Sequence, residues 1–122
     1  MVDERRDERL TALRRVRSRT DFERVYARKV HAADSVLVLN AALNELHDTR
    51  LGLSVSRAVG NAVVRNRWKR MIRDAFRRRR TELPRGLDIV ARPRRGARAD
   101  HRAIGESLVR LSAQLARKLA RG

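Results

Sequence analysis

The chain has 122 residues and a formal net charge of +17, with 31 Lys or Arg residues against 14 Asp or Glu residues. This length predicts one domain with a modest core, and the apolar content of 42% argues against a disordered chain. The absence of cysteine excludes disulfides and thiolate metal sites. The positive charge indicates a polyanionic partner, with nucleic acid as the first candidate and an anionic membrane surface as the second.

No segment has the pattern of a membrane span or a secretory signal. The longest apolar run, Val36 to Leu39, has four residues, whereas a span needs about 20. The first ten residues, MVDERRDERL, lack the apolar centre of a signal peptide. We therefore expect a cytoplasmic protein with no membrane partner, whose charged N-terminal tail, residues 1–12, is mobile.

The first helix is predicted from a capping sequence. In Thr20-Asp21-Phe22-Glu23 the Thr20 hydroxyl can accept from the amide of Glu23, and the Glu23 carboxylate can reach back to the amide of Thr20. Phe22 and Tyr26 then fall on one helical face. Such a pair fits a stacking surface for bases or an ordinary part of the core. Before this helix, the spacing of apolar residues indicates helical character up to Ser18.

Two strands are predicted next. Residues 35–40, SVLVLN, read as a buried strand, and residues 41–49 read as a loose polar connection. Residues 50–56 alternate, with Leu51, Leu53 and Val55 on one side and Arg50, Gly52, Ser54 and Ser56 on the other. The second side is small and polar, so it is either the solvent face of the strand or a surface that a ligand can approach closely.

A basic helix follows Gly60 and Asn61. Its apolar stripe consists of Val64, Trp68, Met71, Ile72, Ala75 and Phe76, and we expect Trp68 to pack in the core. The opposite side carries Asn66, Lys69, Arg70, Arg73 and Arg77, with Arg65 and Arg67 at its two edges. The chain then continues with a strand at 87–93, a basic loop, and an amphipathic C-terminal helix marked by Ile104, Leu108, Leu111, Leu115 and Leu119.

The basic helix has too few acidic neighbours for an ordinary solvated face. Residues 57–80 contain ten Arg or Lys residues and one acid, Asp74, although solvated faces usually alternate charges. Nine of the ten are arginines, which suit bidentate contacts to phosphate. Asn66 adds a neutral donor and acceptor between two arginines. These features predict an RNA-binding or DNA-binding surface.

The order of elements predicts an α+β single-domain sandwich: helix, strands, helix, strand, helix, with a mostly antiparallel sheet. No catalytic group is evident. His31, His47 and His101 are isolated, and there is no nucleophile motif, glycine-rich phosphate loop or carboxylate pair. We therefore expect no catalytic residue and no metal site on the protein.

The run LGLSVSRAVGNAVVRNRWKRMIRDAFR, residues 51–77, resembles the signature of the bacterial ribonuclease P protein component, with its Arg-Asn-Arg block at residues 65–67. TDFERVYARK resembles that family's first helix, and LDIVARP resembles its last strand. The resemblance covers about residues 13–93. It implies a ribosomal-protein-like fold with a left-handed βαβ crossover, so that residues 13–122 form a single RNA-binding domain.

The resemblance also implies a role beside a catalytic RNA, which uses Mg²⁺ to remove the 5′ leader of precursor tRNA. The protein would be a non-catalytic subunit, with one copy per RNA and no cofactor of its own. It implies contacts to that RNA from Arg57, Asn61, Arg65, Asn66, Arg67, Lys69, Arg70 and Arg73. It implies that a separate cleft for the single-stranded leader is lined by Phe22 and Tyr26, with Ser54 and Ser56 on its floor.

Two departures and two alternatives accompany this resemblance. Ala58 stands where the family often has a second basic residue, and SVLVLNAAL lacks the aromatic residue that usually lies on the first strand. A ribosomal or other structural RNA-binding protein would share the charge and the fold without a leader-binding role. A DNA-binding protein would insert the basic helix into the major groove.

Overall fold

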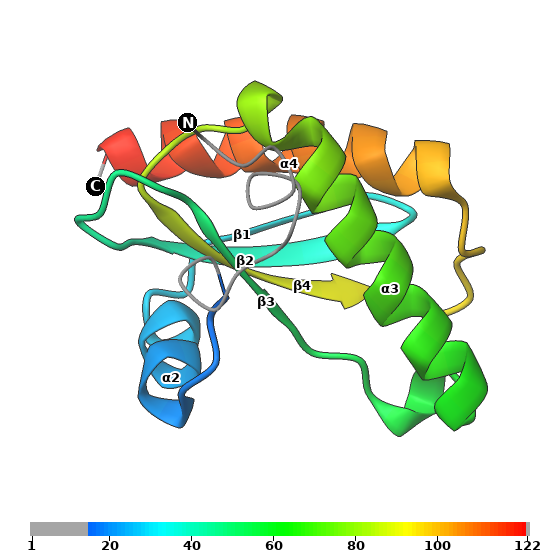
Figure 1. Ribbon diagram of the computed structural model, residues 1–122. Coiled ribbons are helices and arrows are strands. Elements are labelled where there is room, and N and C mark those ends of the chain that lie inside the picture. Colours follow the sequence, from blue (N-terminus) through cyan, green and yellow to red (C-terminus); the bar gives the residue numbers. More distant parts are fainter. Residues whose placement is uncertain (1–14, 122) are drawn as a thin grey trace, which may run out of the picture.

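The computed structural model describes residues 15–121 (Figure 1). The predicted tail, residues 1–12, lies outside the described residues. The elements are α2 (Arg19–Ala27), β1 (His31–Ala33), β2 (Leu37–Leu43), β3 (Arg50–Leu53), α3 (Ala62–Arg79), β4 (Leu87–Pro93) and α4 (His101–Arg121). Single 3-10 turns, η2 (Arg57–Val59) and η3 (Arg80–Glu82), flank α3.

The four strands form one sheet in the order β1-β2-β4-β3 (Figure 1). β2 pairs antiparallel with both β1 and β4, whereas β3 and β4 are parallel. Since α3 connects β3 to β4, these three elements form the expected βαβ crossover. The prediction of an α+β sandwich with a mostly antiparallel sheet is confirmed.

Helices cover both faces of the sheet (Figure 1). α3 and α4 pack on one face, where alternate residues of β2 and β4 join the main core. Its fully buried members include Leu37, Leu39, Ile72, Phe76, Ile89, Leu108, Leu111 and Leu115. α2 lies on the other face, where Val25, Ala42 and Val90 form a smaller buried cluster. The small α2 contact leaves part of that face open.

The entry to α2 differs from the sequence prediction. Ser18, and not Thr20, is the N-cap: its hydroxyl accepts from the Asp21 amide at 3.0 Å. The residues just before the helix are extended and not helical, because the Val16 amide donates to the Leu51 carbonyl at 2.9 Å. The chain therefore runs along β3 before it turns into α2.

The strand boundaries also differ from the sequence prediction. β1 was not predicted, and β2 starts at Leu37 because Asp34 turns the chain by accepting from the amides of Val36 and Leu37. β2 continues to Leu43, through residues assigned to a loop, because these residues pair with β4. β3 stops at Leu53, short of the predicted end at residue 56.

The apolar stripe of α3 is confirmed for all but its first member. Trp68 is buried in the main core as predicted, and the buried side continues through Phe76. Val64 is 38% exposed, because the core contacts of α3 begin one turn later, at Trp68. The first turn of α3 thus presents its side chains to solvent.

Candidate nucleic-acid interface

The start of α3 is set by its two preceding residues. Gly60 has φ 156°, and a Cβ there would lie 2.9 Å from the Cβ of Val64, so a side chain does not fit. Asn61 is the N-cap, whose Oδ1 accepts from the Val64 amide at 3.0 Å. The sequence reasoning assigned Asn61 to RNA binding; in the structure its side-chain oxygen holds the helix start.

The predicted basic face of α3 lies at the surface. Asn66, Arg67, Arg70 and Arg73 are exposed, as is Arg57 on η2, whereas Arg65 and Lys69 are half-buried. Arg65, Lys69 and Arg73 are spaced four residues apart, so they form one row along the helix. We call the eight predicted residues Arg57, Asn61, Arg65, Asn66, Arg67, Lys69, Arg70 and Arg73 the basic face.

The cations of the basic face are unpaired within the described part of the chain. None of them forms an ion pair with another described residue. The only acid of α3, Asp74, binds Arg77 and Arg78 instead. Burial acts to raise the pKa of Asp74, but the hydrogen bond from Arg77 and the nearby positive charges lower it. No acid among the described residues therefore neutralises the basic face, which leaves it available to an external anion.

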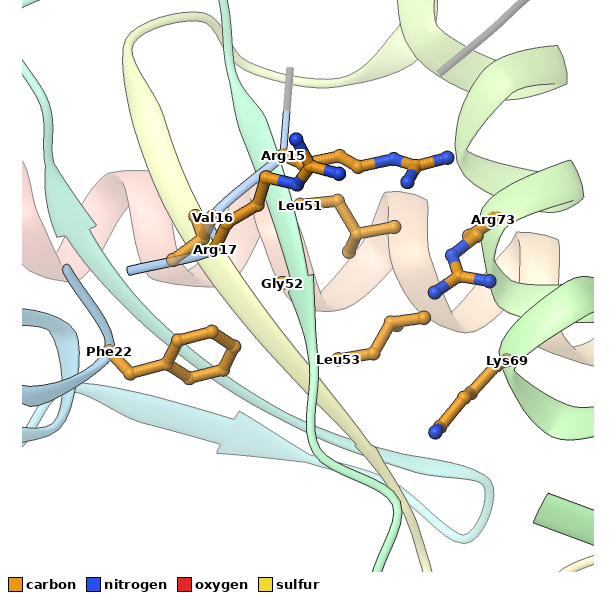
Figure 2. Close-up of a pocket in the computed structure, with 9 residues that line it drawn as sticks. All are labelled: Arg15, Val16, Arg17, Phe22, Leu51, Gly52, Leu53, Lys69 and Arg73. Atoms are coloured by element: carbon orange, nitrogen blue, oxygen red, sulfur yellow. The ribbon is translucent and has the colours of Figure 1, made fainter. Parts of the chain in front are cut away.

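A hollow of about 320 Å³ lies where α3 passes β3 (Figure 2). Lys69 and Arg73 project into it from α3, and Arg15 and Arg17 enter from the segment that runs along β3. Phe22 of α2 lines the same hollow. Four positive side chains and one aromatic ring thus surround this space, and none of the lining residues within 15–121 is acidic.

The charges around this hollow repel one another. Partial burial, followed by the charge of Arg15, lowers the pKa of Arg73 below its usual range. The Nε atoms of Arg15 and Arg65 are buried and have no hydrogen-bond partner among the described residues. Such an arrangement is costly without an anion, because unpaired buried donors and close like charges both destabilise the protein.

Sequence reasoning missed Arg15 and Arg17. They lie in an arginine-rich stretch, but no periodicity connects them to α3, which begins 45 positions after Arg17. Only the parallel bridge of Arg15 with Leu51, closed by the hydrogen bond from the Val16 amide to the Leu51 carbonyl, places these arginines beside the basic face. The abundance of arginine before α2 was the only available signal.

The four residues predicted to line the leader cleft lie on α2 and at or beyond the end of β3. Phe22 and Tyr26 pack against the small buried cluster under α2 but remain half-buried. They therefore serve the core and also keep an exposed side. Ser54 is half-buried and follows Gly52 on the same side of β3, whereas Ser56 is exposed and lies beyond the end of that strand. The structure brings together the two aromatic residues, Gly52 and the end of β3.

The close contact between α2 and β3 depends on Gly52. A Cβ on Gly52 would lie 2.9 Å from the Cβ of Val16 and 3.0 Å from the Cζ of Phe22. Any side chain would therefore displace the ring or the extended segment. The side of β3 that the sequence predicted to carry small residues is therefore the side on which α2 packs.

A buried carboxylate fastens α2 to the sheet. Asp88 of β4 is fully buried and accepts from Arg50 Nε at 2.7 Å, from Asn44 Nδ2 at 3.0 Å, and from Arg24 of α2. Burial acts to raise the pKa of Asp88, but the hydrogen bonds from Arg50 and Asn44 and the two positive charges lower it. This network holds one side of α2 against the sheet.

Two further observations concern residues 15–121. No group of three or more His, Asp or Glu side chains gathers in a way that could hold a metal ion. None of the helices in this range is long and apolar enough to cross a membrane.

The chain is similar to curated proteins named Ribonuclease P protein component. One from Brevibacillus brevis is 42% identical over 97 residues, which covers 78% of this chain and 77% of the relative. Another, from Caldanaerobacter subterraneus, is 36% identical over 105 residues, which covers 85% of this chain and 88% of the relative. The sequence model of the family described as Ribonuclease P matches residues 10–116.

Solved structures show the same similarity. The RNase P protein from Thermotoga maritima aligns with a TM-score of 0.75 at 32% identity, covering 82% of this chain and 96% of that one. The RNase P protein from Staphylococcus aureus aligns with a TM-score of 0.71 at 32% identity, covering 84% and 94%. The chain, with its basic helix and βαβ crossover, belongs to the family of bacterial ribonuclease P protein components.

Proposed function

We propose that this protein binds the RNA subunit of ribonuclease P through the basic face of α3 and holds the single-stranded 5′ leader of precursor tRNA between α2 and the sheet. Its family membership makes it a subunit of ribonuclease P, a ribonucleoprotein endoribonuclease, and a partner of the ribonuclease P RNA. A purely structural RNA-binding role is not favoured by these relatives. The division between two RNA surfaces is our proposal.

One observation carries the proposal. The hollow beside β3 is lined by Phe22 of α2 together with Lys69 and Arg73 of α3. The aromatic side of α2 is therefore continuous with the basic face, where the sequence reasoning had placed the two surfaces apart. A strand of RNA that leaves the basic face can pass directly onto Phe22 and Tyr26.

The chemistry of each surface fits its proposed ligand. Unpaired arginines neutralise phosphates and release counterions, which gives strong and salt-dependent binding. Aromatic rings stack on unpaired bases with little regard to sequence, as a site for varied leaders requires. By lowering the repulsion between phosphates, the protein would reduce the Mg²⁺ concentration that the holoenzyme needs.

Catalysis in this proposal stays with the RNA. We propose that the Mg²⁺ of the holoenzyme is bound by the RNA, and we assign no step to it here. We also propose one protein per RNA in a cytoplasmic complex. Comparing the mass of the reconstituted complex with that of its components tests this stoichiometry.

The test of the proposal is cleavage of precursor tRNA by a cognate ribonuclease P RNA at low Mg²⁺, with and without the protein. We expect the protein to restore cleavage at the mature 5′ end. Tyr26→Ala should weaken the affinity of the holoenzyme for precursor tRNA by about tenfold, from the loss of one stacked base, while the affinity for mature tRNA stays unchanged.

A matched control is Arg117→Ala, which removes an exposed residue from α4 on the opposite face of the sheet. Circular dichroism should show that Tyr26→Ala remains folded. If the wild-type protein bound the RNA tightly but stimulated no cleavage, the proposed use of these two surfaces in precursor tRNA cleavage would be wrong. If Tyr26→Ala weakened the affinity for precursor and mature tRNA equally, only the proposed leader binding would be contradicted.

A further inference from the structure

The sheet face under α2 is organised in three rows of side chains. From the strand register, the first row is Ala42, Asp88 and Arg50, and the second is Asn40, Val90 and Gly52. The third row is Val38, Arg92 and Ser54, since the Ser54 amide donates to the Ala91 carbonyl at 3.0 Å and continues the pairing. We call this third row the open row.

α2 covers the first two rows and leaves the third uncovered. Asp88 in the first row binds Arg24, and Val90 in the second row packs on Val25. The residues of both rows are buried apart from Arg50, whereas all three residues of the open row are half-buried. The open row is therefore the accessible floor beside α2.

Helical geometry places the aromatic residues on the side of α2 toward the open row. Arg24, which binds the first row, and Val25, which packs on the second, fix the orientation of the helix. At about 100° per residue, Phe22 and Tyr26 fall on the flank opposite Arg24. Both rings thus border the floor that carries Arg92.

Arg92 has almost no partner on this floor. Its only hydrogen bond with another described residue runs from Nη2 to Asn40 Oδ1, and it is long, at 3.3 Å. Its Nε is buried without a partner, and it forms no ion pair with a described residue. A guanidinium has five N–H donors, and leaving them unsatisfied in a partly buried position is costly.

We propose that Arg92, oriented by Asn40, binds a backbone phosphate of the leader nucleotide whose base stacks on Phe22 or Tyr26. This inference rests on the proposed function and adds to it a specific anchoring residue on the cleft floor. The aromatic rings supply the flat surface for a base, and the guanidinium supplies a fork that matches two phosphate oxygens. β2 reads LVLNAAL, so no aromatic side chain from this strand fills the space.

The first experiment measures the affinity of the reconstituted holoenzyme for precursor tRNA and for mature tRNA. Arg92→Val removes the charge and keeps a residue that suits a strand, so we expect the preference for precursor over mature tRNA to fall by about tenfold. Arg92→Lys keeps the charge but not the fork, and it should lose less. Arg117→Ala removes one charge from α4 and should leave the preference unchanged.

The second experiment identifies the contacted group. Leaders with a single methylphosphonate linkage remove one phosphate charge at a time. At one position, the methylphosphonate should weaken binding by the wild-type holoenzyme as much as Arg92→Val does. The same methylphosphonate should cause no further loss of affinity in the Arg92→Val holoenzyme. A second set of leaders carries a single abasic nucleotide instead. If only an abasic substitution weakens the wild-type complex and has no further effect on Arg92→Val, then Arg92 contacts a base, and the phosphate assignment is wrong.

The outcomes separate this inference from the function on which it rests. A wild-type holoenzyme with no preference for precursor tRNA would contradict leader binding as a whole. A wild-type preference that survives both Arg92→Val and Arg92→Lys would overturn the role of Arg92 alone. Binding of the ribonuclease P RNA by Arg92→Val should equal that of the wild type, and this equality also reports that the variant is folded.

Discussion

A single carboxylate, Asp88, determines how α2 sits on the sheet. It lies on β4 and binds Arg24 of the helix as well as Arg50 and Asn44. Removing one partner of a buried charge network is strongly destabilising, because the remaining charges lose their compensation. Since α2 carries Phe22 and Tyr26, this buried network also determines the geometry of the leader cleft that we propose.

We predict that Asp88→Asn lowers the free energy of unfolding by about 3 kcal/mol at pH 7. The pKa of Asp88 in the folded protein lies below the ordinary value for an aspartate, because hydrogen bonds and nearby positive charges outweigh burial. The charged carboxylate therefore stabilises the fold at pH values above that ordinary value. This contribution is lost as the pH falls through the lower, folded-state pKa. Urea unfolding at a series of pH values should therefore show the two proteins converging below about pH 4.

The control for this measurement is Glu106→Gln. Glu106 is an exposed residue that pairs with Arg102 one helical turn away, and such pairs contribute at most a few tenths of a kcal/mol. A difference between wild type and Asp88→Asn that persisted unchanged at pH 2 would show that the carboxylate acts through packing and not through its charge.

The residues that sequence reasoning found and those it missed differ in one physical respect. The basic face could be predicted because helical periodicity is local: residues three and four apart share a side. Arg15 and Arg17 reach their positions through pairing with a strand far along the chain. The face on which Arg92 lies could have been predicted, because Val90 and Arg92 are two residues apart in a strand and share one side of it. The alternation was hard to recognise, because a strand that is buried on both faces reads as one apolar run.

At the level of elements, α3 concentrates the charge and the crossover positions it. The helix connects the parallel neighbouring strands β3 and β4, so it crosses one face of the sheet. Its apolar stripe packs on that face, as part of the main core. Its opposite side then has no contact with the rest of the described chain that could neutralise it. The βαβ connection is thus the reason that the basic face is available for the RNA contacts that we propose.

We predict that Arg67→Ala weakens binding to the ribonuclease P RNA by about 1–3 kcal/mol and reduces the slope of log K against log salt by about one. Arg67 is exposed and forms no ion pair with another described residue, so its loss should not affect folding. Titrations of RNA at several salt concentrations measure both quantities. Arg117→Ala is the matched control, and an equal effect from both variants would mean that only net charge matters.

The elements themselves were predictable to different degrees. α3 and α4 were found because long amphipathic periodicity is a strong signal. β1, with the sequence HAA, has none of the residues typical of strands, and it exists because it pairs with β2. The second half of β2 looked like a loop for the same reason, since alanine has a low β-propensity and only its tertiary pairing makes it a strand.

For the whole molecule, the dominant quantity is the net charge of +17 on 122 residues. Self-repulsion at this charge opposes the compact state. The ion pairs among the described residues reduce this repulsion only in their own surroundings, as Asp88 and Asp74 do for the arginines beside them. The fold therefore carries an electrostatic cost that ordinary salt can partly relieve and RNA can relieve further.

We predict that raising NaCl from about 0.01 M to about 0.5 M increases the thermal unfolding midpoint of the free protein, because the screening length falls from about 30 Å to only a few Å. Thermal scans followed by circular dichroism measure this shift. A midpoint that fell with added salt would mean that attractive surface pairs outweigh the repulsion.

The short pairing of Val16 with Leu51 has a consequence for self-association. β3 and β1 are the outer strands of the sheet, and an unpaired outer strand is a template for adding a strand from another copy. β1 offers only three residues, and the segment through Val16 occupies backbone groups of β3. A displaced segment would free the β3 backbone, so the same contact that brings Arg15 and Arg17 to the hollow also protects the protein against polymerisation.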